Sequence, residues 1–156
     1  MKLHRQENVD DKERLKGIFD GLGLVYNKFN FPIIYPIHPR TKKKIREFGL
    51  EVPKGVELIE PLGFLEFLQL EANAKLVLTD SGGVQEETCI LRVPCVTLRD
   101  NTERPETLEV RGNVLVGVNQ NNILEGVKFM LSKERNLENP FGDGKAGEKI
   151  VRILKG

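Results

Sequence analysis

The chain has 156 residues, the usual length of one domain with a single hydrophobic core. Its 24 lysine and arginine residues nearly balance 23 aspartate and glutamate residues, so the net charge favours neither nucleic acid nor an anionic membrane as a partner. The polar residues 1–10 exclude a signal peptide and no apolar run reaches the roughly 18 residues of a membrane span, so we expect a cytoplasmic protein.

The first part of the chain predicts one helix over residues 10–29. Its apolar residues recur at i, i+3, i+4 and i+7, which places them on one helical face. These residues are Leu15, Ile18, Phe19 and Leu22. After this helix, short apolar runs that are rich in β-branched residues alternate with further helical patterns.

The remaining elements follow in regular order. The apolar runs predict strands over residues 32–37, 56–59, 76–79, 93–98 and 114–118. The patterns between them predict helices over residues 40–48, 65–73, 84–91 and 122–133. A last helix is predicted over residues 145–155, with Ile150, Ile153 and Leu154 facing inward.

This alternation, with nearly continuous apolar strands, is typical of a parallel sheet covered by helices on both faces. We predict an α/β fold, a Rossmann-like doubly wound parallel sheet, with residues 1–156 as a single domain. Only Met1, Lys2 and Leu3 precede the first helix, whereas such a sheet usually opens with a complete central strand. We expect a fragment whose missing part lies upstream, and expect that Met1, or Met1 with Lys2, is not native.

The two cysteines, Cys89 and Cys95, lie six positions apart in an apolar stretch. They form no Cys-x-x-Cys pair and have no histidine nearby, so they do not indicate a zinc site. We expect two buried, reduced thiols in a cytosolic compartment, and we expect neither a metal nor a cofactor.

The most informative motif is Thr-Asp-Ser-Gly-Gly-Val-Gln-Glu-Glu at residues 79–87, which follows a strand and opens a helix. Gly82 and Gly83 permit close backbone approach, and a helix N-terminus favours phosphate. Ser81 adds a hydroxyl donor, and Glu87 could accept hydrogen bonds from ribose hydroxyls. In isolation, Ser-Gly-Gly is more often a turn with a serine N-cap, and Glu87 is equally a surface residue. Its place at the carboxyl end of an internal strand favours a diphosphate site.

Polar groups follow three other strands. Arg104 could offer a fork of donors to phosphate, although a solvated loop before a helix starting at Pro105 is the alternative. His4 could act as acid, base or phosphate donor, although a histidine near a terminus is more often inert. His38 and Arg40 follow the strand over residues 32–37. Because parallel strands end at one edge of a sheet, these groups together predict a binding cleft.

Six motifs, taken together and in order, resemble those of the non-hydrolysing UDP-N-acetylglucosamine 2-epimerases over nearly the whole chain. They lie at residues 4–8, 36–39, 59–64, 79–87, 102–106 and 139–146. The resemblance implies two Rossmann-like domains in the glycosyltransferase-B arrangement with the substrate between them. This sequence resembles only the C-terminal domain.

The resemblance also implies roles for individual residues. Phe64 would hold the uracil, Ser81, Gly82 and Gly83 the phosphates, and Glu87 the ribose, while His4, the one catalytic residue assigned, and Arg104 would stabilise the diphosphate. The family interconverts UDP-N-acetylglucosamine and UDP-N-acetylmannosamine, for polysaccharide biosynthesis, by eliminating and re-adding UDP. Its proton-transferring carboxylates lie in the first domain, so none is assigned here. His38 would contact an activating nucleotide sugar or the substrate, but Arg40 replaces the Asn of many relatives and puts that role in doubt.

The expected partners are UDP, UDP-N-acetylglucosamine and the missing N-terminal domain, and a homodimer stays open. We expect the isolated chain to bind UDP without turnover. Two alternatives remain for the parent protein: a hydrolysing UDP-N-acetylglucosamine 2-epimerase, and a glycosyltransferase of the same fold.

Overall fold

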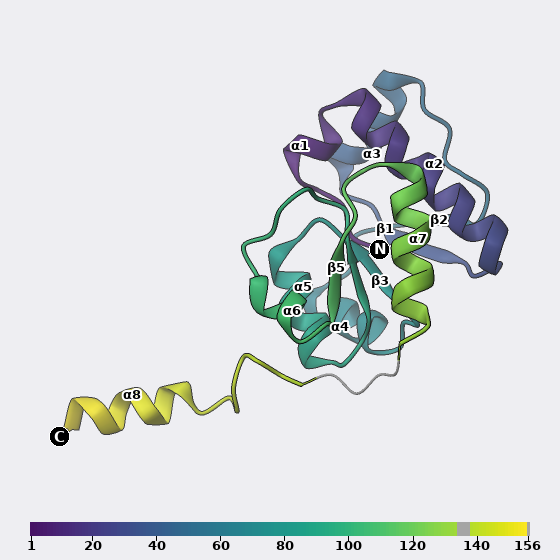
Figure 1. The fold of residues 1–156 in the computed structure, drawn as a ribbon. Coiled ribbons are helices and arrows are strands. Elements are labelled where there is room, and N and C mark those ends of the chain that lie inside the picture. Colours follow the sequence, from purple (N-terminus) through teal and green to yellow (C-terminus); the bar gives the residue numbers. More distant parts are fainter. Residues whose placement is uncertain (134–137, 156) are drawn as a thin grey trace.

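The computed structural model describes residues 1–133 and 138–155 (Figure 1). The strands are β1 (Ile33–Pro36), β2 (Val56–Ile59), β3 (Val77–Thr79), β4 (Cys95–Thr97) and β5 (Asn113–Leu115). The helices are α1 (Gln6–Val9), α2 (Lys12–Phe29), α3 (Pro39–Phe48), α4 (Phe64–Ala72), α5 (Gly82–Ile90), α6 (Pro105–Glu109), α7 (Gln120–Leu131) and α8 (Ala146–Lys155). The predicted alternation of strands and helices is confirmed, and the strands are up to three residues shorter than predicted.

All strand pairs are parallel. One sheet joins β1 to β2, and a second has the order β3-β4-β5. Lys2 bridges the two, because its N–H donates to the carbonyl of Leu78 (2.9 Å) and its carbonyl accepts from the N–H of Asp80 (3.2 Å). On the other side the amino group of Met1 donates to the carbonyl of Ile34 (2.7 Å). The short N-terminal segment therefore occupies the central position, which confirms the doubly wound α/β fold.

Hydrophobic clusters fill both faces of the sheet. Neighbouring strand residues point to opposite faces, and accordingly Leu78 belongs to the larger cluster and Val77 to the smaller one. The larger cluster lies under α2 and α7, and the smaller one under α4 and α5. Close approach of α2 and α7 needs a glycine, since a Cβ on Gly21 would lie 2.7 Å from Cδ1 of Ile123.

The two cysteines, Cys89 and Cys95, are buried and unpaired, as predicted. Burial raises the pKa of the Cys95 thiol to about 12. Among the described residues, no helix has the length and apolar character needed to cross a membrane.

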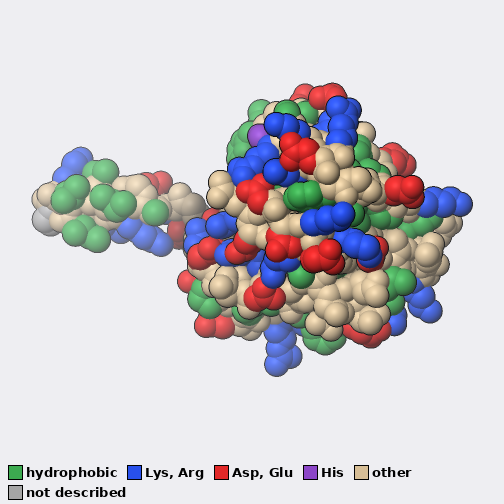
Figure 2. All heavy atoms as spheres, turned by 90° about the horizontal axis from the view of Figure 1, so that it is seen from above, with side chains coloured by type: hydrophobic (Ala, Val, Ile, Leu, Met, Phe, Trp, Pro, Cys, Tyr) green, Lys and Arg blue, Asp and Glu red, His purple; other side chains and the backbone are tan. Residues whose placement is uncertain are grey.

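The prediction for the last helix is wrong in one respect. Helix α8 forms, but Ile150, Ile153 and Leu154 do not face inward, and Ile153 and Leu154 are 79% and 80% exposed. Helix α8 extends away from the body of the molecule, with hydrophobic side chains on its surface (Figures 1 and 2). An amphipathic pattern specifies that a helix has an apolar face, but it does not specify what covers that face.

Candidate functional site

His4 follows the N-terminal segment and Ser81 follows β3, and the strand order reverses between these two neighbours. In open α/β sheets ligands bind outside the carboxyl ends of the strands at such a point. The buried carboxylate of Asp80 accepts from the backbone N–H groups of His4 (3.1 Å) and Arg5 (2.9 Å) and from Nδ2 of Asn8 (3.3 Å). Nδ1 of His4 lies 3.3 Å from Oδ1 of Asp80. Asp80 thus holds the first predicted motif beside the glycine loop.

Helix α5 starts at Gly82, two residues earlier than predicted, so both glycines belong to its first turn. Ser81 occupies the N-cap position, but its hydroxyl makes no capping hydrogen bond. The first N–H groups of a helix have no partner within the helix, and its N-terminus carries a partial positive charge. This end of α5 can therefore receive an anion, with the Ser81 hydroxyl as a further donor.

Nothing in the fold requires glycine at these two positions. An added Cβ at Gly83 would meet only Oγ of Ser81, at 3.9 Å. At Gly82 it would lie 3.6 Å from Oε2 of Glu103 and 3.9 Å from Cγ of Arg104. These are ordinary contact distances, and neither glycine has a positive φ. Both positions therefore leave room for a ligand to approach the backbone closely.

One cavity of about 390 Å³ brings four of the predicted residues together: His4, His38, Phe64 and Glu87. Its other lining residues are Lys2, Leu3, Pro36, Pro61, Leu62 and Phe67. Phe64 is the first residue of α4 and is 67% exposed, so its ring is available to stack on a base. Apolar walls with a few polar groups are typical of a small-molecule site.

His38 also has a structural role. It is the N-cap of α3, and its Nδ1 accepts from the backbone N–H of Arg40 (3.2 Å). The Arg40 side chain forms an ion pair with Asp10. His38 thus lines the cavity with one ring nitrogen already engaged by its own helix.

Arg104 lies beside α5 and does not line the cavity. Its guanidinium pairs with Glu86 of α5 and donates from Nη1 to the carbonyl of Glu103 (2.9 Å). A helix does start at Pro105, as the alternative interpretation had it. Arg104 therefore lies next to the first turn of α5, where the Glu86 carboxylate neutralises part of its charge.

A charge network that the sequence did not predict fixes the loop after β4. The guanidinium of Arg99, which is 5% exposed, donates to Glu7 (2.7 Å) and to Glu103 (2.7 Å). Glu103 also pairs with Arg5 (3.5 Å). The hydrogen bond from Arg99 is the main cause that lowers the pKa of Glu103 to about 2. These ion pairs connect the loop after β4 to the segment that carries His4. Ion pairs therefore hold these two parts of the site together.

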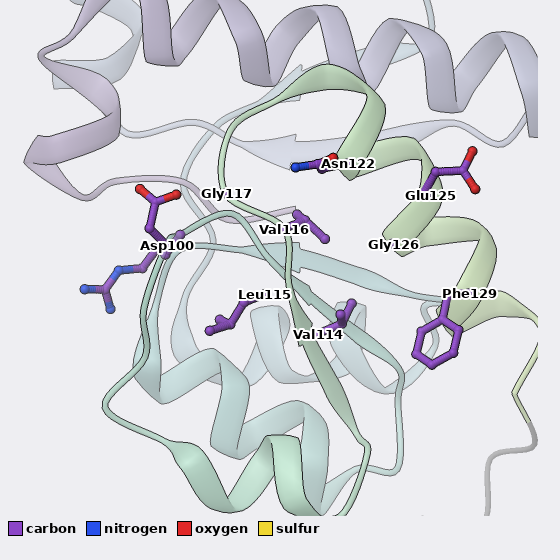
Figure 3. Close-up of a pocket in the computed structure, with 10 residues that line it drawn as sticks. Asp100, Val114, Leu115, Val116, Gly117, Asn122, Glu125, Gly126 and Phe129 are labelled. Atoms are coloured by element: carbon purple, nitrogen blue, oxygen red, sulfur yellow. The ribbon is translucent and has the colours of Figure 1, made fainter.

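A second hollow, of about 520 Å³, lies between β5 and α7 (Figure 3). Asp100, Val116, Gly117, Asn122 and Phe129 are among the residues that line it. None of the predicted UDP-binding residues contributes to this hollow. Of the predicted site residues, the first cavity thus brings together His4, His38, Phe64 and Glu87, whereas Ser81, Gly82, Gly83 and Arg104 line neither of these two hollows.

The sequence analysis did not predict two of these arrangements, the contacts of Asp80 and the ion pairs of Arg99 and Glu103. Asp80 stands inside the predicted motif, and an acidic residue between an internal strand and a glycine loop was a usable signal. Arg99 and Glu103 were visible only as part of a charged loop, because their other partners, Glu7 and Arg5, lie far away in the sequence.

Comparison with known proteins agrees with this geometry. A family model described as UDP-N-acetylglucosamine 2-epimerase matches residues 1–155. The UDP-N-acetylglucosamine 2-epimerase of Methanocaldococcus jannaschii is 60% identical over an alignment covering 97% of this chain and 43% of that protein. A UDP-2,3-diacetamido-2,3-dideoxy-D-glucuronate 2-epimerase of Pseudomonas aeruginosa is 40% identical, with 97% and 42% covered.

A solved structure gives the same result. The crystal structure of the Methanocaldococcus jannaschii UDP-GlcNAc 2-epimerase in complex with UDP-GlcNAc and UDP superposes with a TM-score of 0.92 at 59% identity. The match covers 99% of this chain and 44% of that one, so this chain spans less than half of its relatives' length. The predicted family is confirmed: the chain belongs to the UDP-N-acetylglucosamine 2-epimerase family.

Proposed function

We propose that this chain is the UDP-binding part of a UDP-N-acetylglucosamine 2-epimerase. The enzyme would interconvert UDP-N-acetylglucosamine and UDP-N-acetylmannosamine by eliminating UDP and adding it back. The observation that carries the proposal is the single cavity that His4, Phe64 and Glu87 share, in which Glu87 belongs to α5, the helix that begins at Gly82. Family membership and the relative crystallised with UDP-GlcNAc and UDP support it.

Each group has a role that its place permits. Phe64 offers a ring face to the uracil, and the Glu87 carboxylate accepts from the ribose hydroxyls. Ser81 and the N–H groups of Gly82 and Gly83 receive the diphosphate. His4, held by Asp80, and Arg104, released from Glu86, add positive or donor groups next to it.

The same donors serve the chemical step. Negative charge develops on UDP as the bond between C1 of the sugar and the β-phosphate oxygen breaks. A donor that is already oriented toward developing charge contributes about 2.7–4 kcal/mol in comparable sites. His4 is oriented in this way, since Asp80 fixes both its backbone and its ring.

We assign no group of this chain to proton transfer at C2 of the sugar. We propose that the proton-transferring groups belong to the part of the enzyme that this chain does not span, since more than half the length of the relatives lies outside their match to it. We therefore propose that the isolated chain binds UDP without turnover. We also propose that residues 1–156 form one Rossmann-like domain and that the enzyme is a homodimer. A cytoplasmic location belongs to the same proposal, because the two free thiols favour it.

The residues of this chain say least about which UDP-sugar the enzyme acts on. The Pseudomonas aeruginosa relative acts on a different UDP-sugar and is still 40% identical to this chain. Product analysis with the full-length enzyme distinguishes the alternatives. UDP-N-acetylmannosamine is expected, free N-acetylmannosamine with UDP would mean a hydrolysing epimerase, and sugar transfer to an acceptor would mean a glycosyltransferase.

Titration calorimetry of this chain with UDP, uridine and N-acetylglucosamine tests the binding proposal directly. UDP should bind more tightly than uridine, because only UDP carries the diphosphate, and N-acetylglucosamine alone should not bind measurably. Binding of N-acetylglucosamine without binding of UDP would overturn the proposal. Equal affinity for UDP and uridine would overturn the assignment of the diphosphate to α5.

A further inference from the structure

Helix α4, which carries Phe64 at its start, holds an unusual carboxyl group near its end. Glu71 is 2% exposed, and neither of its carboxyl oxygens has a hydrogen-bond partner among the described residues. It shares the inward face of α4 with Phe67, one turn earlier, which lines the cavity. A buried carboxyl without a partner is costly, so its presence needs a physical explanation.

The charged or titratable groups that interact with Glu71 come from three segments. Glu87 belongs to α5, which packs against α4, Cys95 belongs to β4, and Lys2 and the amino group of Met1 belong to the N-terminal segment. Burial, and next the negative charge of Glu87, raise the pKa of Glu71 to about 8. Near pH 7 the Glu71 carboxyl therefore carries its proton and is a hydrogen-bond donor. In this group of residues the Glu87 carboxylate is the anionic acceptor.

We propose that Glu71 is a positioning residue: with UDP in the cavity, its carboxyl O–H donates to the Glu87 carboxylate and holds it in the orientation that accepts the ribose hydroxyls. This inference rests on the proposed function, which places UDP in the cavity. A carboxylate has about four lone-pair sites, so Glu87 can accept from Glu71 and from two ribose hydroxyls together. Glu87 is the more exposed of the two and faces the cavity, which suits it to keep the charge.

Ionisation of Glu71 removes the donor and leaves two like charges side by side, so the orientation of Glu87 is lost. The readout is the preference for UDP over 2′,3′-dideoxy-UDP, which lacks both ribose hydroxyls. Both nucleotides carry the same uracil and diphosphate, so their own titration cancels in the ratio. The amino group of Met1, whose pKa burial lowers to about 6, changes charge mainly below pH 7 and thus outside the range used.

The experiment is titration calorimetry of this chain with both nucleotides at pH 7.0 and pH 9.0. In the wild type the preference for UDP should fall at least fivefold between these pH values. Glu71→Gln should keep the preference at both, because its amide donates but does not titrate. Glu71→Leu, which can neither donate nor titrate, should already show the reduced preference at pH 7.0. Glu57→Gln, which removes an exposed carboxyl on β2, should behave as the wild type.

Each other outcome contradicts a defined part of the proposal. If UDP binds with a ribose preference that Glu71→Gln and Glu71→Leu leave unchanged at both pH values, Glu71 has no positioning role and the proposed function still stands. Equal affinity of the wild type for the two nucleotides would overturn both the ribose role of Glu87 and the role of Glu71. If the wild type binds neither nucleotide, the proposed function fails and this inference with it. If Glu71→Leu does not fold, the pH comparison with Glu71→Gln decides.

Discussion

Oδ1 of Asp80 lies 3.1 Å from the backbone nitrogen of His4 and 3.3 Å from Nδ1 of its ring. One carboxylate therefore fixes both the main chain and the side chain of the proposed catalytic histidine. The two residues are 76 positions apart in the sequence, and they meet because the N-terminal segment lies next to β3. The contact joins the two halves of the sheet at the point where the ligand is expected.

Asp80→Asn should lower both stability and UDP affinity. The amide has one acceptor oxygen in place of two, which the N–H groups of His4 and Arg5 would have to share, and its NH2 group is a new buried donor that faces other donors. An unsatisfied buried donor costs about 1–3 kcal/mol. Urea denaturation and titration calorimetry measure the two effects. Asp20→Asn, which removes an exposed ion pair with Lys16, should cost less than about 1 kcal/mol and leave UDP binding intact.

Gly83→Val should abolish UDP binding and leave the fold intact. The added Cβ meets only the Ser81 hydroxyl, at 3.9 Å, but it projects where the phosphate would approach the first turn of α5. Gly21→Val is the matched control. The Cβ added there would clash with the side chain of Ile123, so this substitution should lower the melting temperature. A Gly83→Val chain that keeps its melting temperature and still binds UDP would remove the phosphate from this end of α5.

Arg104→Ala should weaken UDP binding about tenfold or more and uridine binding less than twofold, because only UDP carries the diphosphate charge. The substitution also leaves Glu86 unpaired and negative beside the site. The double variant Arg104→Ala/Glu86→Gln removes that repulsion and isolates the loss of the cation. Calorimetry with both ligands measures the ratio. Equal weakening of UDP and uridine by the double variant would show that Arg104 acts on the base or on the fold.

The sequence was sufficient for the fold class and for naming four of the ten residues that line the cavity. Strand ends are readable from apolar runs, and parallel strands bring their ends to one edge, so His4, His38 and Glu87 could be placed together. The family resemblance added Phe64, which no local pattern had singled out. Boundaries were less accurate: α5 starts two residues before its predicted start, because the glycines join the helix rather than precede it.

The rest depends on contacts between distant segments. Asp80, Arg99 and Glu71 acquire their properties from groups on other elements, and no periodicity along the chain encodes such partners. Glu71 is the clearest case, because an acidic residue on a helix is normally solvent-exposed. The error at α8 has the same origin, since its apolar face is encoded locally and its partner is not.

The buried carboxyl of Glu71 should make the chain less stable as the pH rises. Its pKa is raised from the ordinary value of 4.5 to about 8 in the folded chain, so the folded state retains a proton that the unfolded state releases. The stabilising contribution of the protonated carboxyl is therefore fully present below about pH 4.5 and is lost as the pH rises through about 8. Each pKa unit corresponds to about 1.4 kcal/mol, so the loss is on the order of 5 kcal/mol by pH 9.

Urea denaturation of the wild type and of Glu71→Gln at pH 5, 7 and 9 measures this loss as the difference between the two chains. The free energy of unfolding of the wild type should fall relative to the variant from pH 5 to pH 9, since the amide does not titrate. Cys95 and the amino group of Met1 also titrate differently in the folded chain, but they are present in both proteins and cancel in the difference. A difference that stays constant across this range would show that Glu71 is ionised in the folded chain, and its role as a donor to Glu87 would be wrong.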